Sequence, residues 1–166
     1  MDYIKQGDDH FYFRELLPYE EFLKWQSELL QKVRENRTEA HFICCSHPEV
    51  FTLGRGLQKK TGQQLIDFDA ETTNLPYPLF KIKRGGGLTF HHPGQFIFYA
   101  IINLNRPGWS LKFHYDFLLK NIQRVLKHFD LETICSTSPA GIWVNDKKLA
   151  SIGVGVEHFV TTHGLA

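Results

Sequence analysis

The segment "KRGGGLTFHHPGQFIFYAIINL" (residues 83–104) joins a basic pair, three glycines and two histidines to a long apolar run. Its last ten residues, "QFIFYAIINL" (95–104), are largely β-branched or aromatic, which favours a strand. A strand that lacks polar alternation is typically buried on both faces. We therefore expect 95–104 to lie at the centre of a sheet whose faces are covered by helices.

Further strands are expected on both sides of this segment. The apolar or alternating runs that predict them lie at 10–16, 40–46, 49–56, 79–84 and 159–166. The stretch "GIWVNDKKLASIGVGV" (141–156) predicts a hairpin that turns near Asn145-Asp146. Residues 57–78 have no clear period and predict an irregular excursion.

Two segments have the period of amphipathic helices, one opened by Pro18 and one capped by Ser110. Their expected apolar stripes are Tyr19, Phe22, Leu23, Leu29, Leu30 and Val33 in the first, and Leu111, Leu118, Ile122, Val125 and Phe129 in the second. Strands and helices do not alternate strictly, so we expect an α+β fold: a mixed, largely antiparallel sheet with flanking helices. No linker-like tract divides residues 1–166, so we expect a single domain.

Composition excludes several classes of function. A net charge of +1 gives no electrostatic case for binding nucleic acid or an anionic membrane. No run of eighteen apolar residues predicts a transmembrane helix, and the N-terminal residues do not resemble a signal peptide. The cysteines are Cys44, Cys45 and Cys135, which cannot all pair within the chain. We expect a reducing, cytoplasmic location.

The glycine segment matches neither common phosphate-binding motif. No Lys-Ser/Thr follows the glycines, and their contiguous spacing before a strand differs from the dinucleotide fingerprint. A glycine-rich β-turn remains one interpretation. The other is a ligand site, because Arg84, Thr89 and His91 group at a strand junction and contiguous glycines let a ligand lie against bare main chain.

Metal binding and cysteine chemistry are not favoured by the spacing. Neighbours in a strand point to opposite faces, so His91 and His92 rarely share one ion, and no metal site is expected. Cys44 and Cys45 lie in an apolar run, where thiols usually behave as small hydrophobes. Cys135 lies next to a turn and is the most exposed thiol expected, but no local feature lowers its pKa.

Lys147 and Lys148 follow the expected hairpin turn, just before a strand of small residues. Both could be solvated turn lysines. Strand alternation instead predicts that Lys147 faces solvent while Lys148 points inward, where an ammonium group needs a partner or a function. A partly desolvated lysine can depress a thiol pKa or move protons.

Four motifs together resemble the lipoyl(octanoyl) transferase family. They are "HPEVFTLGRG", "RGGGLTFHHPGQFIFYAIINL", "AGIWVNDKKLASIGV" and "THGLA", and the likeness spans roughly residues 47–166. The resemblance implies the fold of the biotin and lipoate protein ligases, with an acyl pocket at its centre. It also implies octanoyl transfer from acyl carrier protein to a lysine of the lipoyl domains of 2-oxoacid dehydrogenases or of the glycine cleavage H protein.

The resemblance assigns roles to particular residues. Lys148 would be the catalytic lysine that tunes a cysteine nucleophile, through which the acyl group passes as an acyl-enzyme, with no ATP, other cofactor or metal. The substrate-binding residues would be Arg84, Gly85, Gly86, Gly87, Leu88, Thr89, Phe90, His91, Ser151, Ile152, Gly153, Gly164, Leu165 and Ala166. Thr89 and His91 would fix the polar end near the thioester, with the glycines lining an acyl tunnel.

This sequence departs from the family pattern at two places. His92 stands where the family usually has glycine. The family's nucleophilic cysteine lies some fifteen residues beyond the "HGLA" motif, a place that none of the three cysteines occupies, so we expect a C-terminal portion to be missing. Two rival functions are an ATP-dependent lipoate–protein ligase and a nucleophile-less module that only binds acyl carrier or lipoyl domains.

Overall fold

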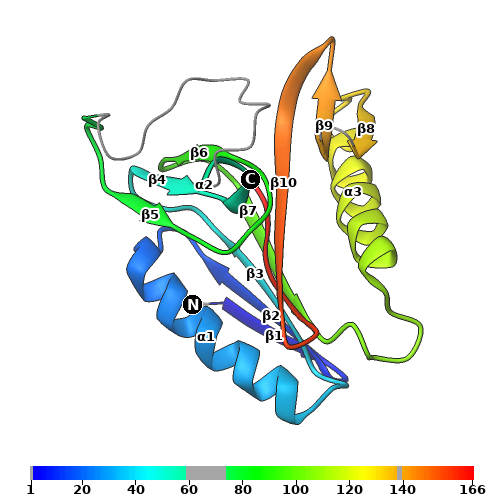
Figure 1. The fold of residues 1–166 in the computed structure, drawn as a ribbon. Helices are drawn as coiled ribbons and strands as arrows, with labels where there is room; N and C mark the ends of the chain where they lie inside the picture. The colour runs from blue at the N-terminus through cyan, green and yellow to red at the C-terminus, as the bar shows by residue number, and fades with distance from the viewer. Residues whose placement is uncertain (1, 59–73, 138–139) are drawn as a thin grey trace.

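The computed structural model describes residues 2–58, 74–137 and 140–166. Within them, most of the expected elements are present, in an α+β arrangement with two long helices (Figure 1). The strands are β1 (Asp2–Gln6), β2 (Asp9–Arg14), β3 (Ala40–Cys45), β4 (Val50–Leu53), β5 (Leu79–Lys81), β6 (Leu88–His91), β7 (Ile97–Ile102), β8 (Ile134–Thr137), β9 (Ala140–Val144), β10 (Lys147–Glu157) and β11 (Val160–Leu165). The helices are α1 (Tyr19–Glu35), α2 (Arg55–Gln58) and α3 (Leu111–Lys127).

Strand β7 is central, as its unbroken apolar sequence predicts. The main sheet has eight strands in the order β1-β2-β3-β7-β11-β10-β9-β8, and only the β2–β3 pair is parallel. Tyr99 and Ile101 belong to one buried cluster. Ala100 and Ile102, which alternate with them along the strand, belong to another. Both faces of β7 are therefore covered, and the expected α+β fold with a largely antiparallel sheet is confirmed.

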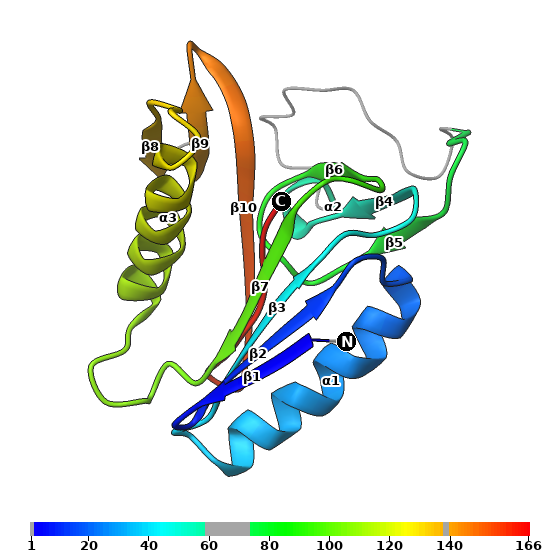
Figure 2. The same cartoon turned by 180° about the vertical axis from the view of Figure 1, so that it is seen from behind.

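The two long helices cover opposite faces of this sheet. Helix α1 buries Phe22, Leu29 and Val33 in the first cluster, together with Tyr99 and Ile101 of β7. Helix α3 contributes Leu118 and Leu119 to the second cluster. Figures 1 and 2 show α1 along β1, β2 and β3, and α3 beside β8 and β9. In the described part of the chain, no helix is long and apolar enough to cross a membrane.

A second, smaller sheet carries the glycine segment. Its strand order is β5-β4-β6, and β6 begins directly after the three glycines. Strands β1, β6 and β8 and helix α2 were not expected from the sequence. β1 lacks the apolar signal because all five of its residues are exposed. Residues 59–73 of the expected excursion lie outside the described residues.

The expected hairpin is present, and its strand β10 is unusually long. Asn145 and Asp146 have positive φ values of 47° and 62°, which suits the tight turn between β9 and β10. The first part of β10 pairs with β9 and the second part with β11. The register with β9 shifts between Lys148 and Ala150, which leaves Leu149 as an extra residue.

The apolar stripe expected for the second helix was partly wrong. Ser110 does cap α3, since its side chain accepts a hydrogen bond from the Phe113 N–H. However, Leu111, Val125 and Phe129 are exposed, and Phe129 lies beyond the end of the helix. The buried face of α3 is instead made by His114, Leu118 and Leu119. Apolar residues occur on several sides of this helix, so the period alone did not fix which side packs.

His114 makes the stability of this packing depend on pH. Its side chain is fully buried, neither ring nitrogen has a hydrogen-bond partner among the described residues, and burial lowers its pKa from 6.5 to about 4. Between these two values the unfolded chain binds more protons than the folded chain, so stability falls as pH falls.

We expect His114→Leu to lessen the loss of stability between pH 6.5 and pH 4. At about 1.4 kcal/mol per pKa unit, the change should be up to about 3 kcal/mol, measured by urea unfolding at several pH values. The exposed His128, in the residue just after the same helix, provides the control substitution His128→Gln. Equal pH dependence in the wild type and in His114→Leu would contradict this expectation.

Candidate functional site

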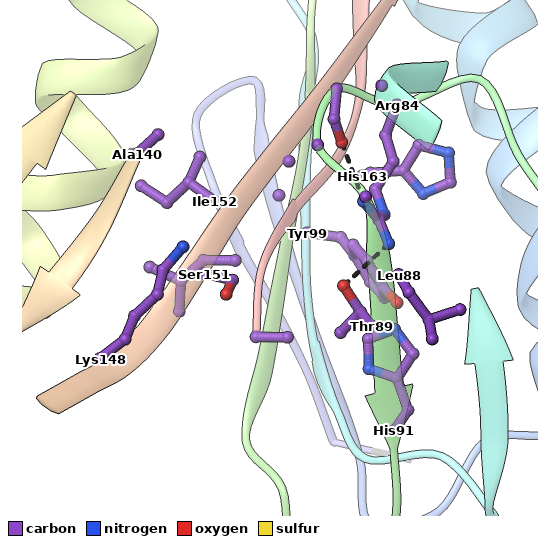
Figure 3. A pocket seen from close by; sticks show the side chains of 18 of the residues that line it. Arg84, Leu88, Thr89, His91, Tyr99, Ala140, Lys148, Ser151, Ile152 and His163 are labelled. Carbon is purple, nitrogen blue, oxygen red and sulfur yellow. Dashed lines mark hydrogen bonds between the residues drawn. The ribbon is translucent and has the colours of Figure 1, made fainter. Parts of the chain in front are cut away.

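A cavity of about 670 Å³ brings together the separate sequence motifs. Most of the residues that the resemblance singles out line it: Arg84, Gly85, Gly86, Gly87, Leu88, Thr89, His91, Lys148, Ser151, Ile152, Gly153, Gly164, Leu165 and Ala166. In Figure 3, Lys148, Ser151 and Ile152 lie on one side, and Arg84, Thr89 and His91 lie on the other. A volume of this size suits a small-molecule site.

Phe90 is the one expected binding residue that does not line the cavity. It lies between Thr89 and His91 in β6, and strand alternation sends its side chain to the opposite face. Its ring packs there against Phe51, at 4.8 Å between centroids, and Tyr77, at 5.5 Å. The structure therefore places the Phe90 ring outside the cavity lining, because β6 is a strand and not an open loop. A role of Phe90 in binding stays a prediction.

Arg84 is a buried cation in the cavity lining. Its side chain is only 7% exposed. One terminal nitrogen donates to the Thr52 carbonyl (3.0 Å), the Thr52 hydroxyl (2.8 Å) and the Thr89 hydroxyl (2.8 Å), and the other donates to the Gly85 carbonyl (2.8 Å). No acidic side chain among the described residues forms an ion pair with it. The site therefore keeps a net positive charge held by neutral acceptors.

Glycines make the space that Arg84 occupies. A Cβ atom on Gly54 would lie 2.7 Å from an Arg84 terminal nitrogen, and one on Gly153 would lie 2.9 Å from its Cδ. Gly86 has a φ of 79°, a conformation that side chains disfavour. By contrast, a Cβ on Gly85 would meet only the Val154 carbonyl oxygen at an ordinary 3.6 Å. Gly54 and Gly153 therefore make room for the arginine side chain, and Gly86 and Gly153 also border the cavity.

His91 is held by hydrogen bonds at both ring nitrogens. The Gln95 side-chain oxygen can only accept, so His91 Nδ1 donates to it (2.8 Å). The Gln95 amide group in turn donates to the Phe90 carbonyl, which fixes its orientation. His91 Nε2 therefore accepts from the Thr52 hydroxyl (3.3 Å). Burial lowers the His91 pKa to about 4, so this ring is neutral near pH 7.

Other lining residues were not identified from the sequence: Tyr19, Gly56, Tyr99, Tyr115, Ala140 and His163. Tyr99 belongs to the apolar run of β7 and is itself buried in the first cluster, so the sequence marked it only as a core residue. Its hydroxyl bonds to His47 Nε2 at 2.8 Å, while His47 Nδ1 donates to the Leu17 carbonyl. The Tyr99 hydroxyl must therefore donate to His47. The histidine of the "HPEVF" motif was the available signal for this pair.

Lys148 lies in the cavity lining, whereas Lys147 does not. Because Leu149 is an extra residue in the strand, Lys148 falls on the same face of β10 as Ser151. The Lys148 stem crosses Gly141, where a Cβ atom would lie 2.5 Å from Lys148 Cε. Its ammonium lies 5.8 Å from the centre of the Trp143 ring. Partial burial lowers the Lys148 pKa.

The three cysteines lie outside this lining. All are free thiols. Burial raises the pKa of Cys44 to about 11 and that of Cys45 to about 12, and it also raises the pKa of Cys135. None is therefore prepared as a thiolate near neutral pH. No cluster of three or more potential metal ligands occurs in the described residues.

The arrangement combines a partly apolar cavity with two cations and neutral imidazole rings. Arg84 is held by several hydrogen bonds, whereas Lys148 lies on the opposite side of the cavity, beside the Trp143 ring. Such a site favours a neutral ligand that develops negative charge while it reacts.

Comparison with known proteins relates the chain to enzymes of protein lipoylation. A sequence model of the lipoyl protein ligase A/B catalytic domain matches residues 18–166. The chain is 35% identical over 156 residues to an octanoyltransferase of Nostoc sp., covering 93% of this chain and 68% of that protein. It is 31% identical over 160 residues to a chloroplastic octanoyltransferase of Arabidopsis thaliana, covering 93% of this chain and 55% of that protein.

A solved structure of lipoate-protein ligase A bound with ATP has the same fold, with a TM-score of 0.65 and 12% identity. That likeness covers 93% of this chain and 64% of the ligase. The chain thus spans between about half and about two thirds of the length of these relatives.

We expect Gly153→Ala and Gly85→Ala to differ sharply in stability. The new methyl group at 153 would lie 2.9 Å from Arg84 Cδ and 3.0 Å from the Gly85 oxygen, so the buried arginine must move. Overpacking of this kind costs about 1–3 kcal/mol. Gly85→Ala should change the free energy of unfolding by less than about 0.5 kcal/mol. Chemical denaturation of both variants measures the difference, and equal losses would argue against the arginine enclosure.

Proposed function

Because the chain belongs to the octanoyltransferases of the lipoyl protein ligase A/B catalytic domain family, we propose that it transfers octanoyl groups in protein lipoylation. The donor is octanoyl-acyl carrier protein. The acceptors are lysines of lipoyl domains, such as those of 2-oxoacid dehydrogenases and the glycine cleavage H protein. The observation that carries the proposal is one cavity lined by all three expected binding segments and by Lys148.

The proposed chemistry needs no ATP, because a thioester is already activated. A thiolate attacks the octanoyl carbonyl carbon, a C–S bond forms, and the carbonyl electron pair moves to oxygen. When that pair returns, the carrier thiolate leaves and accepts a proton. The acceptor lysine amine then attacks the new thioester, loses a proton and releases the enzyme thiolate. In this scheme, Lys148 stabilises the thiolate as an ammonium group and exchanges protons with it.

The proposed thiol nucleophile is not one of the cysteines in residues 1–166. Cys44, Cys45 and Cys135 lie outside the cavity lining, and burial raises the pKa of each. Cys135, which the sequence predicts to be the most exposed of the three thiols, has its sulfur 4.0 Å from the Leu119 carbonyl oxygen. We propose that no octanoyl adduct forms on any of the three.

Two further proposals concern organisation and location. Residues 1–166 act as one catalytic domain, because β10 pairs with β9 at one end and with β11 at the other. The protein works in the cytoplasm, a proposal that its three free thiols support.

An acyl-transfer assay with two lysine variants tests the function. Octanoyl-acyl carrier protein and a lipoyl domain are mixed with the protein from the complete gene, and mass spectrometry follows octanoylation of the domain. We expect Lys148→Ala to lose at least about 100-fold in rate, since general acid–base groups contribute that much. Lys147→Ala, outside the cavity lining, should keep most of the activity.

Three other outcomes would redirect the assignment. Transfer only from free octanoate plus ATP would indicate a ligase, and binding of both carriers without turnover would indicate a docking module. Equal losses in the two lysine variants would overturn the role given to Lys148. A hydroxylamine-labile adduct that disappears in Cys135→Ser would move the nucleophile to Cys135.

A further inference from the structure

His163 has a backbone conformation that is unusual within a strand. It lies in β11, yet its φ is 60°, in the left-handed region that residues other than glycine seldom adopt. The strand pairing with β10 continues on both sides, with Gly155 opposite Thr162 and Gly153 opposite Gly164. Strained residues of this kind cluster at functional sites, where the surrounding structure holds them in place.

A buried side chain on α1 holds this conformation. The Gln26 side-chain oxygen accepts a hydrogen bond from the His163 backbone N–H at 2.8 Å. Gln26 is a buried polar residue on a helix face that otherwise buries mainly apolar side chains. Gly164, the residue after His163, passes so close to β7 that a Cβ atom on it would collide with the Phe98 carbonyl oxygen. Helix, strand and glycine together fix where His163 points.

The imidazole ring of His163 faces the cavity. It contributes to the lining, near Arg84 in Figure 3, and lies 6.3 Å from the Tyr99 ring between centroids. Neither of its ring nitrogens forms a hydrogen bond with a residue that the structure describes. His91 and His47, by contrast, use both ring nitrogens within the protein. Of these three histidines, His163 is the one with ring nitrogens left for a ligand.

The charges around His163 decide what it can do. Burial and the nearby Arg84 and His91 lower its pKa to about 3, so the ring is neutral at working pH. A group with such a pKa is a poor base near pH 7. A neutral imidazole can still donate its N–H to an oxygen that gains negative charge, without bringing a second cation beside Arg84.

We propose that His163 is a further catalytic residue, whose ring N–H donates a hydrogen bond to the carbonyl oxygen of the bound acyl group. This inference rests on the proposed acyl transfer. As a nucleophile adds to the carbonyl carbon, the π electron pair moves to oxygen and the N–H···O bond strengthens. When the pair returns, the carbon–sulfur bond to the leaving thiolate breaks, and His163 keeps its proton throughout. Gln26 is a positioning residue, because it acts through the His163 backbone.

His163→Gly separates this role from a structural one. Glycine adopts a φ of 60° without strain, so the backbone should not lose stability, whereas the donor is lost. We expect kcat to fall on the order of 100-fold, as for loss of one oxyanion donor, with a smaller change in KM. The shape of the pH–rate profile should not change, because the lost group does not titrate near pH 7.

His158 supplies a matched control in the same hairpin. It is an exposed histidine with a φ of 49°, so His158→Gly makes the same change in the same backbone conformation outside the cavity lining. This variant should keep wild-type kcat. A kcat for His163→Gly within about threefold of the wild type, or a parallel loss of activity and thermal stability, would overturn the proposal.

Two variants test the positioning by Gln26. Gln26→Met keeps the length of the side chain but removes the acceptor, and should lower kcat. Gln26→Glu keeps an acceptor oxygen for the His163 N–H and should restore most of the rate. Equal rates in both variants would remove Gln26 from the proposal.

A ligand that cannot react makes the inference testable without turnover. The probe is a ketone analogue of octanoyl-pantetheine, with a methylene in place of the thioester sulfur and ¹³C at the carbonyl. Binding should move its carbonyl resonance downfield in the wild type and in His158→Gly, and much less in His163→Gly. A bound analogue with the same shift in all three proteins would refute the hydrogen bond even if transfer occurs. Absence of binding would refute both the hydrogen bond and the acyl site, whereas a shift without transfer would refute only the transferase activity.

Discussion

The structure depends on burying one guanidinium group without a carboxylate. Desolvating a charge is costly unless hydrogen bonds and space are provided, and both are provided around Arg84 by separate segments of the chain. Thr52 and Thr89 supply hydroxyl groups, while Gly54, Gly86 and Gly153 leave room for the side chain. The same requirement draws β4, β6 and β10 together, so the residues that bind the arginine also bring the cavity walls into place.

The unpaired cation also sets the chemistry of its neighbours. Arg84 lowers the pKa of both His91 and His163, in addition to the larger effect of burial. Neutral rings then have definite donor and acceptor atoms, as the Thr52–His91–Gln95 series shows. A second cation close to Arg84 would be unfavourable, and Lys148 lies on the opposite side of the cavity. The site thus keeps its two positive charges apart.

Sequence reasoning predicted the fold well wherever a single signal dominated. The unbroken apolar run of β7, the cap at Ser110 and the Asn145-Asp146 turn are local signals, and each corresponds to the structure. It missed β1, whose residues are all exposed, and it was only partly right about the buried face of α3, which includes Leu118 but not Leu111 or Val125. In the site, the sequence motifs indicated the glycine segment and Lys148. The Gln26–His163 bond joins residues 137 positions apart, and no local pattern predicts it.

The extra residue at Leu149 has a consequence for how this hairpin can vary. Lys148 pairs with Trp143 before the bulge, and Ser151 pairs with Gly141 after it, so all four share one face. In an unbulged strand, residue 148 would be out of phase with residue 151, and the ammonium would face away from the cavity. Deletion of one residue at this bulge would therefore keep the hairpin but turn the Lys148 side chain away from the cavity. An insertion or deletion of an odd number of residues in this part of β10 would move Lys148 to the other face of the strand, whereas an even number would not.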